Sequence, residues 1–183
     1  EYAWSTSASA PSSGWASFTN GATITSPAGV TGNYYLYVKA RDKATPEGNV
    51  TMVRSNVFKI DNTAPTAPTI TLSTENWTNQ NVTVAISGGS DSHSGVNRIE
   101  YRINGGSWTV YSSSFNITNE GITTVEARTV DNAGNVSSIV SKQAKIDRTA
   151  PTPPIITVNP STWTNQNVTV TISPGSDSGS GVH

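Results

Sequence analysis

Apolar residues alternate with other residues over short stretches along most of the chain. Ile70 and Leu72 share one phase, and Val82, Val84 and Ile86 share another. Successive side chains of a strand point to opposite faces, so a period of two predicts half-buried strands. No stretch predicts a helix, and we expect an all-β protein.

Residues 63–148 are expected to form seven short strands separated by turns. The segment Asn104-Gly-Gly106 is a strong hairpin signal between two of them. Strands of this length and spacing predict a Greek-key β-sandwich of immunoglobulin type. The side chains expected to fill its core are Ile70, Val84, Ile86, Ile99, Tyr101, Val125 and Ala127.

The chain repeats itself with a period of 86 residues. Residues 77–84, Trp-Thr-Asn-Gln-Asn-Val-Thr-Val, return unchanged as residues 163–170, and residues 61–68 return with two changes as residues 147–154. Such a period marks tandem copies of one structural unit. The prolines of residues 63–68 and 149–154 cannot donate to a sheet ladder, so these segments predict linkers or sheet edges.

The repeat divides the chain into one complete and two partial copies. Residues 1–62 match strands C to G, since Leu36, Val38 and Asp42 correspond to Val125, Ala127 and Asp131 at an offset of 89. Residues 63–148 are a whole copy, and residues 149–183 match strands A and B. In the first copy Leu36, Val38 and Ala40 share one face of an expected half-buried strand, which this partial copy alone would leave exposed, and further strands are expected at residues 22–25 and 50–60.

The composition argues against two classes of protein, nucleic-acid binders and proteins with a membrane-spanning helix. Eleven Lys and Arg against twelve Asp and Glu give a net charge of −1, without the basic patch of a nucleic-acid binder. No apolar run reaches the roughly 20 residues of a membrane helix. The chain has no cysteine, and charged residues make up only 13% of it. These features are typical of an extracellular, secreted or cell-surface β-protein whose strands carry small polar residues outward.

Several motifs together resemble bacterial immunoglobulin-like repeats, which occur in tandem in large secreted and cell-surface proteins. They are the linker Thr63-Ala-Pro-Thr66, the Gly95-Val96 boundary after Asp91-Ser-His-Ser94, Tyr101-Arg-Ile-Asn-Gly-Gly-Ser-Trp108 and Asp131-Asn-Ala-Gly-Asn-Val-Ser137. The resemblance implies an immunoglobulin-like fold. It also implies a spacer, an adhesin stalk, a surface-layer piece or an accessory module of a polysaccharide-degrading enzyme.

The sequence predicts no catalytic site. Its histidines are His93 and His183, and His93 has Asp91 and Ser94 beside it on one expected loop. Residues one and two positions apart cannot converge in the order that a catalytic triad requires. We therefore expect a non-enzymatic protein.

Calcium is the candidate ligand. Loops B–C and F–G of an immunoglobulin-type sandwich lie at the same end as the incoming linker. The oxygen-bearing residues of these segments are Asp61, Asp91, Asp131, Asn132 and Asn135. Their convergence would suit Ca²⁺ between domains. The alternative is that Asp and Asn cap turns without any metal.

The function expected from these features is that of a non-catalytic extracellular spacer, stalk or assembly unit, with neighbouring repeats or copies of itself as partners. The partial copies are complementary, so strands A and B of one molecule could complete the next in a head-to-tail filament; excision from a longer array is the other explanation. Val168, Val170 and Ile172 would then pack against Tyr2, Leu36 and Val38. The alternative function is an accessory carbohydrate-binding module using Trp77 and Trp163, with cell-wall or extracellular polysaccharide as partner.

Overall fold

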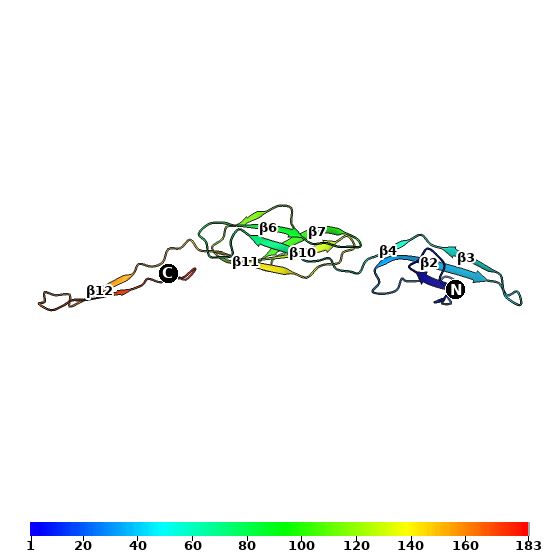
Figure 1. The fold of residues 1–183 in the computed structure, drawn as a ribbon, viewed down its shortest axis with the longest axis horizontal. Coiled ribbons are helices and arrows are strands. Elements are labelled where there is room, and N and C mark those ends of the chain that lie inside the picture. The colour runs from blue at the N-terminus through cyan, green and yellow to red at the C-terminus, as the bar shows by residue number, and fades with distance from the viewer. Residues whose placement is uncertain (183) are drawn as a thin grey trace. The chain divides into compact units, whose positions relative to one another are not determined.

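The computed structural model describes residues 1–182 and contains strands but no helix in that range (Figure 1). The all-β expectation is confirmed. The strands of residues 1–62 are β1 (Tyr2–Ser5), β2 (Gly32–Arg41), β3 (Val50–Arg54) and β4 (Phe58–Ile60). Those of residues 63–148 are β5 (Pro68–Leu72), β6 (Val82–Gly88), β7 (Val96–Ile103), β8 (Thr109–Val110), β9 (Phe115–Ile117), β10 (Gly121–Asp131) and β11 (Val140–Ile146). The last two are β12 (Ile155–Asn159) and β13 (Thr169–Ser173).

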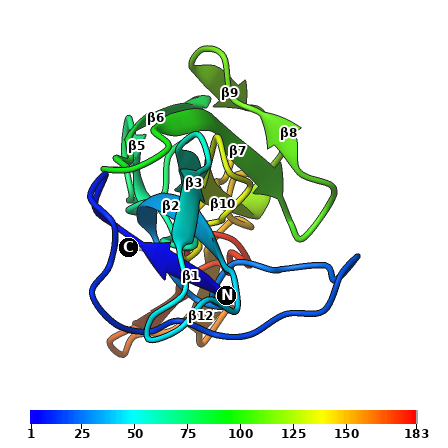
Figure 2. The same ribbon diagram turned by 90° about the vertical axis from the view of Figure 1, so that its right-hand side faces the viewer.

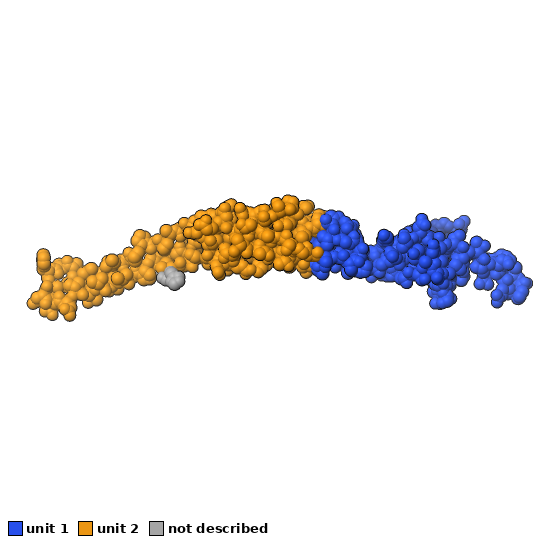
Figure 3. Space-filling view, turned by 45° about the horizontal axis from the view of Figure 1, so that its top comes forward, with its two compact units in different colours: residues 1–66, 90–97, 129–137 blue, residues 67–89, 98–128, 138–183 orange. Residues whose placement is uncertain are grey.

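Contacts divide the chain into two compact units (Figure 3). Unit 1 contains residues 1–66, 90–97 and 129–137, and unit 2 contains residues 67–89, 98–128 and 138–183. The loops of the middle copy at residues 90–97 and 129–137 therefore group with the first copy. This division does not follow the repeat boundaries.

Unit 2 contains a two-sheet core. Strands β5, β6 and β9 form one sheet, and β7, β8, β10 and β11 belong to the other, in the order β11-β10-β7-β8. Figure 2 labels β5, β6 and β9 of the first sheet and β7, β8 and β10 of the second. The pairs β5–β6 and β6–β9 of the first sheet and β10–β11 and β7–β8 of the second are antiparallel. The buried side chains between them are Ile70, Leu72, Val82, Val84, Ile86, Ile117, Val125, Ala127, Ala144 and Ile146. The arrangement is that of a β-sandwich, whose inward residues alternate with outward polar ones.

Most of the predicted core is confirmed. Ile70, Val84, Ile86, Val125 and Ala127 are buried, and Ile99 and Tyr101 pack against them while partly exposed. The hairpin at Asn104 also forms: β7 pairs with β8, and Asn104 and Gly105 both have positive φ, 48° and 71°. Asn and Gly favour that conformation, so the local sequence explains the turn.

Unit 1 holds a four-stranded sheet in which β2 pairs with β1, β3 and β4. Leu36 and Val38 are only half-buried and Ala40 is exposed, whereas Tyr37, on the opposite face, is 3% exposed and pairs with Ala3. The reason is that no second sheet covers the Leu36 face within unit 1.

Other differences concern strand boundaries. Residues 50–60 form two strands, β3 and β4, because residues 55–57 leave the ladder. Residues 22–25 are not a strand, and the strand expected from Val136 to Ile146 is shorter, since β11 begins at Val140. Val136 instead forms an isolated bridge with Val130 across the turn.

Candidate functional site

Asp61 follows β4 and begins the linker to the middle copy. Its Oδ1 accepts a hydrogen bond from the Thr63 amide at 2.9 Å, and its Oδ2 accepts one from the Ser94 amide at 3.0 Å. The pKa of Asp61 is below its ordinary value because the Ser94 side chain lies beside the carboxylate and because these amides donate to it. The Ser94 hydroxyl forms no well-aligned hydrogen bond, so we assign the shift chiefly to the amides.

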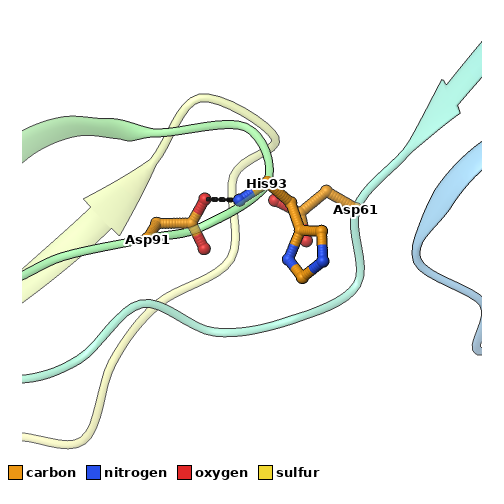
Figure 4. Close-up of side chains that lie close together, drawn as sticks. All are labelled: Asp61, Asp91 and His93. Atoms are coloured by element: carbon orange, nitrogen blue, oxygen red, sulfur yellow. Dashed lines mark hydrogen bonds between the residues drawn. The ribbon is translucent and has the colours of Figure 1, made fainter.

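Asp91 holds the loop that carries Ser94. Its Oδ1 accepts hydrogen bonds from the amides of His93, at 3.0 Å, and Gly95, at 2.7 Å. Two amides on one carboxylate oxygen are typical of an Asx turn. The side chains of Asp91 and Asp61 lie on either side of His93 (Figure 4). Potential ligand atoms of the three residues lie within 4.8 Å of one another.

The F–G loop adds no carboxylate to this cluster and contacts the linker and the B–C loop through asparagine side chains. Asp131 is buried, and its two oxygens accept hydrogen bonds from the amide and the Nδ2 of Asn135, each at 2.8 Å. Asn135 Nδ2 also lies 3.1 Å from the Asp61 carbonyl oxygen, and Asn132 Nδ2 donates to the Ser94 carbonyl at 2.9 Å. Asp131 thus closes its own loop, and both asparagines bind backbone carbonyls through their nitrogens.

The structure therefore brings two of the five predicted calcium residues, Asp61 and Asp91, into one cluster and adds His93. The cluster offers two carboxylates and one imidazole, whereas Ca²⁺ takes six to eight oxygen ligands. Three of these carboxylate oxygens already accept amide hydrogen bonds. Calcium at this position stays a prediction, and turn capping accounts for the contacts that are present.

The junction between the middle and last copies repeats the same hydrogen bonds. Asp147 accepts from the amides of Thr149, at 3.1 Å, and Ser180, at 2.7 Å. Asp177 accepts from Gly179 and Gly181, as Asp91 does from His93 and Gly95. A Cβ atom at Gly179 would lie 2.5 Å from Asp147 Oδ2, so this junction has no room for the side chain that His93 provides in the first.

A threonine–serine pair extends each junction. The Thr66 amide donates to the Ser90 carbonyl at 2.8 Å, and the Ser90 amide donates to Thr66 Oγ1 at 2.7 Å. Thr152 and Ser176 make the same two bonds with the same lengths. The two junctions therefore share a network of backbone amides, hydroxyls and two carboxylates.

Sequence reasoning missed a third carboxylate at the later junction, that of Glu120. Glu120 Oε1 accepts hydrogen bonds from the amides of Arg148 and Thr149 and from Thr149 Oγ1. These bonds, with the Thr149 hydroxyl as the largest cause, lower the pKa of Glu120. In the first copy Thr31 Oγ1 accepts a hydrogen bond from the Asn62 amide and shares one with the Thr63 hydroxyl. The sequence offers one indication of this role, which is the position of Glu120 just before a strand. The residue at the same repeat position in the first copy, Thr31, is not acidic.

Two of the tryptophans have covered faces. Trp108 lies under the guanidinium groups of Arg102 and Arg128, at 4.6 and 4.1 Å from ring to carbon. Trp15 lies under Lys39, at 4.0 Å. Each of these cations covers ring surface on which a sugar would otherwise stack.

Comparison with protein-family models, curated proteins and solved structures gave no match. Among residues 1–182 there is no helix long and apolar enough to cross a membrane.

Proposed function

We propose that the protein is a non-catalytic extracellular structural repeat of a bacterial surface or secreted protein, built from tandem immunoglobulin-like Greek-key copies. It acts as a spacer, stalk or assembly unit. The sheets β5-β6-β9 and β11-β10-β7-β8 support the fold part of this proposal, because they pair strands in the way such a sandwich requires.

One observation carries the functional part: the network at Asp61 returns at Asp147. In each case an Asp binds a serine amide 33 positions further along the chain, and a Thr–Ser pair follows. A linker held by its own hydrogen bonds keeps its shape without a ligand. A chain whose most regular feature is its linkers is suited to setting the spacing between copies.

Limited proteolysis of the 183-residue chain tests the proposal. Residues 61–68 and 147–154 should resist cleavage in the wild type, because ordered backbone is a poor protease substrate. Asp61→Ala should open the first linker and leave the second intact, which serves as the internal control. Cleavage of both wild-type linkers at the rate of an unstructured peptide would contradict a spacing role.

A second candidate function, carbohydrate binding, has one feature in its favour. The side chain of Trp163 is fully exposed, and an open indole face can stack on a pyranose ring. Trp77, the other tryptophan considered for this role, is half-buried. Retention on insoluble polysaccharide, lost in Trp163→Ala and kept in Trp108→Ala, would support this alternative.

A further inference from the structure

His93 gives the first junction a type of metal ligand that the second junction lacks. Its ring lies between the carboxylates of Asp61 and Asp91, and one potential ligand atom from each of the three residues lies within 4.8 Å of the others (Figure 4). All three residues belong to unit 1. The second junction has the two corresponding aspartates, but Gly179 stands in place of His93. The junctions therefore share their carboxylates and differ in the imidazole.

An imidazole beside two carboxylates favours one class of ion. Ca²⁺ and Mg²⁺ bind oxygen atoms, whereas Zn²⁺ and neighbouring transition metals bind imidazole as well as carboxylate. Zn²⁺ usually takes four ligands, and a site with three protein ligands leaves the fourth position to water. Asp61, Asp91 and His93 supply three ligands. The cluster therefore suits an ion of the zinc class better than it suits Ca²⁺.

The hydrogen bonds already made by these side chains are compatible with an ion. Each carboxylate oxygen has two lone pairs, so the single amide on each oxygen of Asp61 leaves one lone pair free. Among the described residues, Oδ2 of Asp91 accepts no hydrogen bond. Ligating carboxylates are usually hydrogen-bonded as well, and a ligating imidazole bonds a second group through its other nitrogen. Ser92 Oγ, 3.2 Å from His93 Nδ1, is such a group.

An unsatisfied hydroxyl lies at the same place. Ser94 lines a hollow of unit 1 together with Asp61 and His93. Its Oγ is closed off from solvent and has no well-aligned hydrogen-bond partner among the described residues. Buried polar atoms of this kind are uncommon in folded proteins, and a bound ion or water is one explanation for them. This observation does not depend on the carboxylates, and it too points to a ligand.

We propose that the first junction binds a divalent transition-metal ion of the zinc class through Asp61, Asp91 and His93, and that the second junction does not. The inference goes beyond the proposed spacer role, which needs no ion. The ion joins the linker that carries Asp61 to the loop that carries Asp91 and His93, so it reinforces one joint and leaves the other to its hydrogen bonds. Lys59 is the one basic side chain among the residues lining the hollow, and the two carboxylates outweigh its charge.

Calorimetric titration with ZnCl₂ tests the site. The 183-residue chain, dialysed first against EDTA and then against plain buffer, should bind a single Zn²⁺. His93→Gly should weaken binding at least about 10-fold, since even the loss of an outer contact to a ligand has an effect of that size. This variant should fold, because Gly179 occupies the same position at the second junction. His183→Ala, which removes the other histidine of the chain, is the matched control and should bind as the wild type does.

Asp91→Asn removes the negative charge and keeps a carbonyl oxygen for the amides of His93 and Gly95. It should weaken zinc binding at least about 10-fold and leave the melting temperature in metal-free buffer unchanged. In NMR spectra of the imidazole nitrogens, Zn²⁺ should shift the signals of His93 and leave those of His183 in place.

Three results would overturn the proposal. They are equal zinc affinity in the wild type and His93→Gly, His93 signals that do not move with Zn²⁺, and Ca²⁺ binding as tight as Zn²⁺ binding. None of them decides the spacer role, because the proteolysis test is made without added metal.

Discussion

The carboxylate of Asp61 accepts a hydrogen bond from the backbone amide of Ser94, which is 33 residues further along the chain. Through this bond the linker fixes the B–C loop of the next copy. Asp61→Ala removes the acceptor for both Ser94 and Thr63. Hydrogen exchange at these two amides should accelerate, while exchange at Ser180 and Thr149 of the second junction stays at the wild-type rate.

Asp91→Ala is the matched comparison for that experiment. It should expose the amides of His93 and Gly95 and leave Thr63 protected, because Thr63 depends on Asp61 alone. Equal acceleration at all four amides in both variants would show that the loop and the linker unfold as one piece.

Acid should weaken both junctions. The pKa values of Asp61, Asp147 and Glu120 are lowered in the folded chain by the donors around them. A lowered folded pKa stabilises the fold at pH values above the ordinary pKa, and that contribution is lost as the pH falls through the folded value. The melting temperature should therefore be flat near neutrality and fall below about pH 4.5, the ordinary value for Glu.

Glu120→Gln provides the control for the acid experiment. It removes one titrating group, so the melting temperature should fall less steeply with decreasing pH, and the difference is the contribution of Glu120. A profile identical to that of the wild type would mean that the hydrogen bonds from Arg148 and Thr149 do not persist in solution.

Truncation to alanine should destabilise the middle copy strongly at one position of the repeat and hardly at all at the equivalent position of the last copy. Ile86→Ala should lower the free energy of unfolding of the middle copy by about 2–5 kcal/mol, because Ile86 is buried between two sheets. Ile172→Ala, at the same repeat position, should change it by less than about 0.5 kcal/mol in dilute solution. Urea denaturation of the two variants measures both values.

Glu100 makes the most enclosed ion pairs of the described residues. Its oxygens accept from Arg98 at 2.7 Å and from Arg128 at 2.8 Å. Burial alone would raise the pKa of Glu100, but the hydrogen bonds and charges of the two arginines outweigh it and lower the pKa. Glu100→Gln should cost about 1–3 kcal/mol, whereas Glu75→Gln, in the exposed pair with Lys142, should cost less than about 0.5 kcal/mol.

Chelation addresses the cluster of Asp61, Asp91 and His93. Because three of the four carboxylate oxygens of Asp61 and Asp91 already accept amide hydrogen bonds, we expect EDTA to leave the melting temperature unchanged in dialysed protein. A lower melting temperature in EDTA that millimolar Ca²⁺ restores, and that Asp91→Ala abolishes, would establish a cation at this junction.

The alternation of residues was enough to predict the core of the middle copy. Val84 and Ile86 face inward because the middle copy contains both sheets, and the apolar residues of each sheet lie on the face toward the other. The same pattern placed Leu36 and Val38 on one face of β2, where they are half-buried, but periodicity identifies a face and not what covers it. Tyr37 is buried instead, under residues of the loop after β1, including the Ser7 carbonyl.

The junction could be predicted only in part. Asp61 and Asp91 were identified by their place in the repeat, but the partner of Asp61 is a backbone amide, which leaves no trace in residue type. Glu120 was missed because its role passes to Thr31 in the first copy. A hydrogen bond that either side chain can accept imposes no residue identity on the sequence.

The reliance of each junction on backbone amides affects how the repeat can multiply. An amide donor is present in every residue except proline, so the acceptor Asp and the turn of the receiving loop are the chief requirements for a joint. A gene segment that is duplicated or exchanged in whole periods of 86 residues carries both with it. New copies can therefore be inserted in frame, and their strands can diverge in sequence, without redesign of the connection between them.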